Sequence, residues 1–310
     1  MNLNNIRKII KKGAVLENVP MSKHTTFRVG GPARYFITPN NTAELAGLVR
    51  YLYNNGLKYY VIGNGSNLLV SDKGYDGTII DLSSHDGTEF TMLGLDDEND
   101  PVKFEVGAGS LMSNLGKLML RFEVTGFEPL SGIPGCIGGA CTMNAGAYGG
   151  EMADIVTGAI IVDRTGAVRH LTKDELDFSY RHSAVQDEGY IITKVELELH
   201  KGDPEKIKAL MDEYTASRKE KQPLEYPSAG STFKRPEGNF AGKLIEEAGL
   251  RGYSLNGASV SEKHCGFVIN KGGATASDIY RLINDVKARV YENSGVMLEP
   301  EVRMLGEFEQ

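Results

Sequence analysis

The chain has 310 residues, of which 41% are hydrophobic and 24% charged, and its formal net charge is −7 with a pI near 5.5. This composition is typical of an ordinary globular protein with room for two or three domains. No cluster of Lys and Arg interleaves with aromatic residues, which argues against nucleic-acid binding. No apolar run reaches the length of a signal peptide or a membrane span, so we expect a cytoplasmic protein that does not bind membranes.

Three cysteines, Cys136, Cys141 and Cys265, give an odd count. No pair has the two-residue spacing of a zinc or redox motif. We therefore expect reduced, packed thiols and no metal site.

The first third of the chain mixes predicted helices and strands. Residues 42 to 55 predict a surface helix with Thr42 as its N-cap and one apolar face, formed by Leu45, Leu48, Val49 and Leu52. The runs KYYVIG, LLVSD and GTIIDL predict strands. After them, VKFEVGAG continues the strand pattern and SLMSNLGKLMLRFEV the helix pattern. The fold class is therefore α+β.

A domain boundary is predicted near residue 203. Before it, IITKVELELH alternates apolar and polar residues, as a strand with one wet face does. After it, a helix is predicted with Asp203 as cap, Pro204 at its first position and Pro223 beyond its end, and it would bury Ile207, Leu210, Met211 and Tyr214. Two more helices, near 241 to 248 and 277 to 293, and a closing strand in VMLEPEVRMLG complete a small α+β domain.

The stretch VIGNGSNLLVSD contains a glycine-rich turn between two predicted strands, formed by Gly63, Asn64, Gly65, Ser66 and Asn67. Glycine permits conformations that turn successive N–H groups toward an anion, so this turn suits a pyrophosphate. A tight hairpin explains the same residues equally well. The Rossmann motif is excluded, because its third glycine is missing and a strand follows where a helix is required.

A second stretch, LSGIPGCIGGACTMNAGAYGG, has no charged residue from Pro129 to Gly150 and contains seven glycines. Such a sequence is unsuited to a buried helix. Exposed backbone over this length suits a flat ligand with phosphates, such as a flavin dinucleotide, because missing Cβ atoms let amides approach ring edges and oxygens. The alternative is a long irregular crossover in the core.

Two charged residues attract notice in the second half of the chain. Arg181, in YRHS, lies in a non-helical segment, and Glu301 follows Pro300 in the predicted closing strand, with Arg303 on the same face. On local sequence alone, both are better explained as surface ion-pair residues than as catalytic groups.

Ser231, in PSAGSTFKRP, follows two small residues and has no histidine within thirty positions. Its S-x-x-K spacing is that of penicillin-recognising enzymes, but their mechanism needs Ser and Lys one turn apart on a helix, and Pro236 drives the residue before it toward extended backbone. No histidine suggests a Ser-His-Asp triad. A hydroxyl without a base is a poor nucleophile, yet it can protonate a carbanion, which hydride transfer from a reduced flavin to an electron-poor double bond creates.

Seven segments spanning nearly the whole chain resemble the UDP-N-acetylenolpyruvoylglucosamine reductase (UDP-N-acetylmuramate dehydrogenase) family: TTFRVGGPARYF, VIGNGSNLLVSD, SGIPGCIGGACTMNAGAYG, YRHS, SAGSTFKRP, AGKLIEEAGLRG and LEPEVR. The resemblance implies an FAD-binding fold of the p-cresol methylhydroxylase type, with two α+β lobes and a small α+β substrate domain. The lobes would comprise residues 1 to 82 and 83 to 203, with 303 to 310 returning to the first. The substrate domain would comprise residues 204 to 302.

The implied reaction is the NADPH-dependent reduction of an enolpyruvyl ether to UDP-N-acetylmuramate, a cytoplasmic step in bacterial peptidoglycan synthesis. The resemblance assigns catalytic roles to Arg181, Ser231 and Glu301, and it overrules the ion-pair interpretation of two of them. Hydride would pass from flavin N5 to C3 of the substrate. Arg181 and Glu301 would polarise the carboxylate beside C2, and Ser231 would protonate C2.

The resemblance also assigns binding residues. Lys221 would contact the substrate diphosphate, with Arg235 and Lys234 as helpers. Because the chain passes directly from His200 to the helix at Pro204, it lacks the tyrosine-bearing loop of one subgroup and resembles the shorter subgroup. The residues implied to line non-covalently bound FAD are Gly63, Asn64, Gly65, Ser66, Asn67, Ser131, Gly132, Ile133, Pro134, Gly138, Gly139, Asn144, Ala145 and Gly146.

Two rival hypotheses stay open. Another flavin oxidoreductase of the same fold would keep the glycine-rich stretches but would not need the catalytic trio. A nucleotide-binding module without turnover would use the charged groups for recognition alone. A UDP-sugar is the small-molecule partner that the resemblance implies, and no protein partner is implied.

Overall fold

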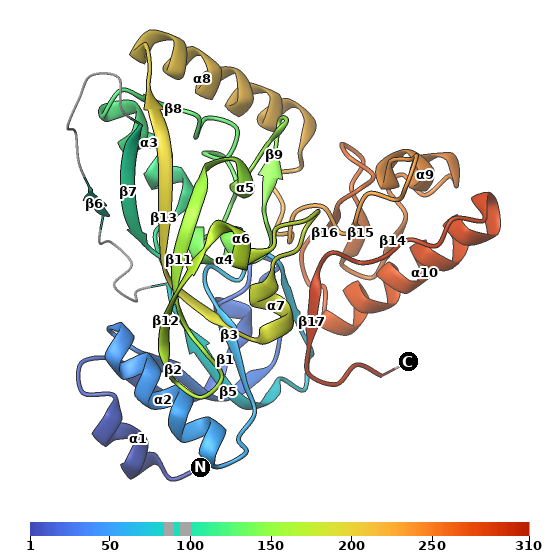
Figure 1. The fold of residues 1–310 in the computed structure, drawn as a ribbon. Coiled ribbons are helices and arrows are strands. Elements are labelled where there is room, and N and C mark those ends of the chain that lie inside the picture. Colours follow the sequence, from blue (N-terminus) through green and yellow to red (C-terminus); the bar gives the residue numbers. More distant parts are fainter. Residues whose placement is uncertain (84–89, 94–100, 310) are drawn as a thin grey trace. The chain divides into compact units, whose positions relative to one another are not determined.

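The computed structural model describes residues 1 to 83, 90 to 93 and 101 to 309. These residues form two compact units. Unit 1 comprises Met1–Leu16, Tyr35–Asn64 and Gly77–Ala216, and unit 2 comprises Glu17–Arg34, Gly65–Asp76 and Ser217–Gln310. Both units mix helices and strands, as the labels in Figure 1 show, which confirms the predicted α+β class. The expected division at residues 82, 203 and 302 is a different one and stays a prediction.

The N-terminal part of the chain contains a four-stranded sheet with the order β1-β2-β5-β3. Helix α2 (Thr42–Asn54) contributes the predicted apolar face to the core of this part, because Leu45, Leu48, Val49 and Leu52 are all buried. The other elements are α1 (Leu3–Ile9), β1 (Ala14–Pro20), β2 (Pro32–Thr38), β3 (Tyr59–Ile62) and β5 (Tyr75–Asp81).

The predicted N-cap of α2 is wrong by one residue. Asn41 has extended backbone, and its side chain accepts the N–H of Glu44 at 2.9 Å, so Asn41 is the cap and Thr42 is the first helical residue. Asparagine is among the preferred N-cap residues because its short amide reaches the free N–H groups of the first turn.

Glu44 ties the start of α2 to the segment before β1. Its carboxylate, 7% exposed, accepts the backbone N–H groups of Lys11, Lys12, Gly13 and Asn40 at 2.7 to 3.2 Å. Burial alone would raise the pKa of this carboxyl, but the four N–H donors outweigh burial and lower it below 4.5.

Replacing Glu44 by glutamine is expected to reduce the free energy of unfolding by about 1 to 3 kcal/mol, because a neutral amide accepts these hydrogen bonds less well than a carboxylate. The folded-state pKa is the lower one, so the loss should be complete above the unfolded-state pKa and should fade as pH falls through the folded-state pKa. Urea unfolding at several pH values measures both effects. The exposed Glu17→Gln variant is the control, and equal stabilities of both variants at neutral pH would contradict the prediction.

The larger sheet of unit 1 has the order β12-β11-β13-β7-β6, and β8 pairs with β13. Strand β13 (Ile191–Lys201) shows the predicted alternation, with Val195, Leu197 and Leu199 buried. The remaining elements are β6 (Phe90–Met92), β7 (Val102–Gly107), α3 (Met112–Arg121), β8 (Val124–Thr125), β9 (Gly146–Ala147), β10 (Gly150–Glu151), α5 (Met152–Ile155), β11 (Val156–Val162), β12 (Val168–Thr172), α6 (Lys173–Leu176) and α7 (Ala184–Glu188).

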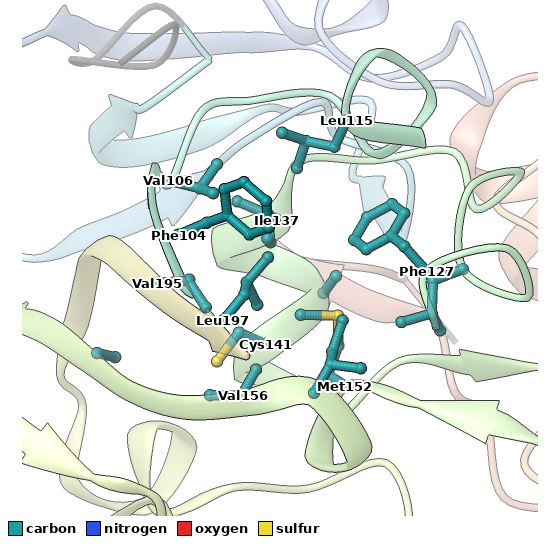
Figure 2. Packing of buried hydrophobic residues seen from close by; sticks show 14 of the residues in the cluster. Phe104, Val106, Leu115, Phe127, Ile137, Cys141, Met152, Val156, Val195 and Leu197 are labelled. Atoms are coloured by element: carbon teal, nitrogen blue, oxygen red, sulfur yellow. The ribbon is translucent and has the colours of Figure 1, made fainter. Parts of the chain in front are cut away.

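The glycine-rich stretch contains a short buried helix, contrary to the sequence prediction. Helix α4 (Ile137–Thr142) places Ile137 and Cys141 in the core beside β7 and β13, as Figure 2 shows. A Cβ on Gly138 would lie 2.6 Å from the Cβ of Ala108, so glycine is what lets this helix approach the end of β7. The glycines therefore serve close packing as well as backbone exposure.

Helix α8 (Pro204–Lys221) begins as predicted. The Asp203 carboxylate accepts the N–H of Glu205 at 2.9 Å. The predicted buried face is only partly right, because Ile207 is buried but Leu210 is 39% exposed. A surface helix buries only the stripe that faces the core, and in α8 this stripe is narrower than predicted.

Unit 2 has a core of its own, built around α9 (Ala241–Glu247), α10 (Ala276–Ser294) and the sheet β14-β15-β16 (Ser254–Leu255, Ala258–Val260, Val268–Asn270). Both predicted helices are confirmed. Strand β4 (Leu68–Val70) pairs in parallel with β17 (Arg303–Leu305). A 3-10 turn, η1 (Met21–Lys23), belongs to the same unit. The predicted closing strand is much shorter than expected, since β17 begins only at Arg303.

Among the described residues, no helix combines the length and apolar character that crossing a bilayer requires. The same residues contain no group of three or more His, Cys, Asp or Glu side chains arranged to hold a metal ion.

Candidate active site

The first glycine-rich turn connects strands of different sheets, so the hairpin alternative is wrong. Strand β3 pairs with β5, whereas β4 pairs with β17. Gly65 has φ +60°, and a Cβ there would lie 2.0 Å from the carbonyl oxygen of His24. Only glycine fits this position.

Within unit 1, the first turn contacts the second glycine-rich stretch. A Cβ on Gly63 would lie 3.3 Å from Cβ and Sγ of Cys136, the residue before α4. Burial raises the pKa of the Cys136 thiol to about 11, so the thiol is neutral near pH 7. All three cysteines are free and buried, which confirms the prediction of packed thiols.

The second stretch also has open positions. Gly132 and Pro134 are exposed, and a Cβ on Gly139 would meet no atom within 4 Å. Ser131 is buried, and its hydroxyl donates to the carbonyl of Glu128 at 2.8 Å. A segment fixed by buried groups, with glycines at exposed positions, fits a flat ligand with phosphates, as the sequence suggested.

Arg181 stands at the tip of a turn that contacts the same stretch. Its backbone is left-handed, with φ +57°, and Ser179 and His182 exchange backbone hydrogen bonds of 3.1 Å across the turn. The guanidinium Nη2 donates to the carbonyl of Gly146 at 3.2 Å, and the Asn144 amide donates to the carbonyl of Ser179 at 3.0 Å. Three predicted site residues, Arg181, Asn144 and Gly146, are therefore brought together in unit 1.

Ser231 lies on a non-helical segment of unit 2, which removes the S-x-x-K mechanism as expected. Gly230 before it has φ +74° and open space where a Cβ would be, and Ser231 is exposed. The next residue, Thr232, is fully buried. Its N–H donates to the carbonyl of Gly266, and its Oγ1 accepts the N–H of Val268, both at 2.8 Å. An anchored threonine thus holds an accessible serine.

Glu301 lies beside this anchored segment. Its N–H donates to the carbonyl of Thr232 at 2.9 Å, and the Asn67 amide donates to the carbonyl of Glu301 at 3.2 Å. Because β17 begins at Arg303, the expectation that Glu301 and Arg303 share one strand face does not hold. Three predicted residues, Ser231, Glu301 and Asn67, are nevertheless neighbours in unit 2.

The predicted substrate-binding cations have different surroundings. Lys221 is exposed at the end of α8, and Lys234 forms an ion pair with Glu299. The Arg235 guanidinium carbon lies 4.1 Å from the ring centroid of Phe240, a cation–π distance. Phe240 is exposed and was not singled out from the sequence, because a lone aromatic residue carries no signal.

Ser183 and Gln186 were not predicted as site residues, although their spacing forms a recognisable pattern. Ser183 and Gln186 form an S-x-x-Q pattern at the start of α7, which is the signature of a capping box. Their side chains donate instead to the carbonyl of Thr142, at 2.6 and 3.0 Å. The pattern can be recognised in the sequence, but the contact of both side chains with Thr142 cannot.

Comparison with known proteins gives a consistent result. Residues 222–305 match the family model described as UDP-N-acetylenolpyruvoylglucosamine reductase, C-terminal domain, and residues 33–172 match the FAD binding domain model. The chain is 47% identical over 303 residues to the UDP-N-acetylenolpyruvoylglucosamine reductase of Clostridioides difficile, covering 98% of this chain and 97% of that protein. It is 49% identical over 298 residues to the enzyme of the same name from Agathobacter rectalis, covering 95% of each.

A solved structure agrees with these relatives. The crystal structure of UDP-N-acetylenolpyruvylglucosamine reductase from Thermus caldophilus matches with a TM-score of 0.80 at 36% identity, covering 95% of this chain and all of that one.

Proposed function

The chain belongs to the UDP-N-acetylenolpyruvoylglucosamine reductase family, and on this premise we propose that it reduces UDP-N-acetylenolpyruvoylglucosamine to UDP-N-acetylmuramate with electrons from NADPH. It is an oxidoreductase with FAD as its cofactor, and its fold is the FAD-binding fold of the p-cresol methylhydroxylase type with a small α+β domain. We place the reaction in the cytoplasm, as a step of peptidoglycan precursor synthesis.

One observation carries the proposal: the exposed Ser231 lies beside Glu301, in a backbone frame held by the buried Thr232. Ser231 precedes the buried Thr232, whose carbonyl accepts the N–H of Glu301. A proton donor needs only a rigid support and an open approach, which Thr232 and Gly230 supply.

The glycine-rich segments fit the cofactor. Gly63 to Asn67 and residues 131 to 146 would hold FAD, with the left-handed Gly65 shaping the first segment and the open Gly139 leaving room along the second. Bound there, FAD would supply the hydride chemistry, accepting a hydride from NADPH and delivering it to C3 of the enolpyruvyl group.

We assign the three catalytic residues to stabilising negative charge on the substrate and to donating a proton to it. Arg181 is a permanent cation, and we assign it and Glu301 to the substrate carboxylate, where negative charge grows as C3 gains hydride. Ser231 gives its proton to C2. Lys221 and Arg235 are assigned to the diphosphate, and residues 204 to 302 to substrate binding, as the family resemblance suggests.

A single spectroscopic experiment tests the proposal. The purified protein, or the protein reconstituted with FAD, should be yellow. NADPH should bleach the flavin absorption, and UDP-N-acetylenolpyruvoylglucosamine should restore it anaerobically. Bleaching without restoration would favour another flavin oxidoreductase of this fold, and a protein that stays colourless with FAD would leave only a nucleotide-binding module.

A further inference from the structure

We propose that Gln186 is a positioning residue that holds the backbone of Arg181 and fixes it to the end of helix α4. The inference rests on the catalytic role proposed for Arg181. It adds a residue that touches neither substrate nor cofactor in the proposed mechanism.

The first reason is the conformation of Arg181. A non-glycine residue at φ +57° occupies a sparsely populated region and must be held there by its surroundings. The Gln186 amide donates to the carbonyl oxygen of Arg181 at 3.2 Å. This hydrogen bond holds the peptide group that follows Arg181. It therefore helps to fix the backbone conformation of Arg181 and, with it, the direction of the arginine side chain.

The second reason is the other partner of Gln186. The same Nε2 donates to the carbonyl oxygen of Thr142, the last residue of α4, at 3.0 Å. The buried Ser183 hydroxyl donates to that carbonyl as well, at 2.6 Å. One side chain thus bridges Arg181 to the cofactor-binding stretch, and a second side chain secures the attachment point.

The third reason is where the side chains of Ser183 and Gln186 donate their hydrogen bonds. In a capping box, Ser183 and Gln186 would bond to each other's backbone N–H groups and stabilise the first turn of α7. Helix α7 has no side-chain cap hydrogen bond from Ser183. The Ser183 hydroxyl donates to the carbonyl of Thr142, and the Gln186 amide donates to the carbonyls of Thr142 and Arg181, so both side chains connect α7 to main-chain groups outside the helix.

The turn is tied to the cofactor-binding stretch at other points too. Asn144, fully buried and left-handed at φ +43°, donates to the carbonyl of Ser179 and accepts the N–H of Ala153 at 2.9 Å. The Arg181 guanidinium donates to Gly146. Residues 142 to 146 therefore hold the turn that carries Arg181 at several points. Gln186 links this segment to the main chain of Arg181.

Losing this bridge should misplace the guanidinium without removing it. A displacement of about 1 Å can cost about 100-fold in rate. In Gln186→Leu, which removes the amide and leaves an apolar side chain, we expect substrate-driven reoxidation of the reduced flavin to slow by about 10- to 100-fold. Flavin reduction by NADPH and the FAD dissociation constant, measured by fluorescence, should stay within about 3-fold of the parent protein, because neither involves Arg181.

The test is a double-mutant cycle on the FAD-loaded protein, followed by stopped-flow absorbance, with Glu188→Gln on the exposed side of α7 as control. If Gln186 acts through Arg181, Gln186→Leu should add almost nothing to Arg181→Ala. Gln186→Glu, which fills the same space but cannot donate two hydrogen bonds, should behave like Gln186→Leu and replaces it if the leucine variant does not fold.

The outcomes separate two kinds of failure. Normal reoxidation in both Gln186 variants, equal losses in both half-reactions, or full additivity with Arg181→Ala would overturn this inference alone. Normal reoxidation in Arg181→Ala itself would overturn the role proposed for the arginine and this inference with it.

Discussion

Ser231→Ala is expected to lower turnover by about 10²- to 10⁴-fold, the range typical of losing a well-placed proton donor. The variant should still bind FAD, and NADPH should still bleach the flavin, because the hydroxyl takes no part in that half-reaction. The loss should therefore fall on reoxidation by the enolpyruvyl substrate. Anaerobic stopped-flow absorbance of the two half-reactions separates them.

Ser231→Ala should remove the hydroxyl without disturbing the surrounding backbone. The side chain is exposed, and the surrounding frame is held by Thr232 rather than by the serine, so the melting temperature should change little. Ser113→Ala, at an exposed position of α3, is the control. Near-normal turnover in Ser231→Ala would remove the assignment of Ser231 as the proton donor.

Arg181→Ala should slow reoxidation by about 10²- to 10³-fold, which is the usual cost of losing one group that stabilises developing negative charge. Arg181→Lys keeps the charge but cannot present a planar fork, so it should recover only part of the rate. Because the charge on the substrate carboxylate grows in the transition state, the loss should appear in kcat as well as in kcat/KM.

Arg121→Ala, at the exposed end of α3, controls for the loss of a positive charge elsewhere in the unit. A loss confined to KM, with kcat unchanged, would show that Arg181 binds the ground state and the transition state equally. In that case its role would be substrate binding and not charge stabilisation.

Much of the fold was predictable because the periodic patterns are strong. The alternation in β13 and the apolar face of α2 both follow from burial against a core, and each was confirmed. Helix α4 was not predicted, because its glycines read as breakers when no partner is known. The benefit of Gly138 depends on Ala108, which lies some thirty residues away in the sequence and comes close only in the folded chain.

The candidate site could not be built from local patterns. Ser231 and Glu301 are separated by 70 positions, and they become neighbours through an isolated bridge between Phe233 and Pro300 that no periodicity announces. Only the family resemblance named both residues. Gln186 was not predicted at all, because its contacts with Thr142 and Arg181 form only in the folded chain.

The pairing of β4 with β17 has a consequence for biosynthesis. Leu68–Val70 leave the ribosome long before Arg303–Leu305, the strand with which they pair. At about 5 to 20 residues per second, β4 waits on the order of ten seconds or more with unpaired backbone groups. This pairing therefore forms only after residues 303 to 305 have been translated, and ribosome-bound chains that end before residue 303 are expected to leave β4 without this partner.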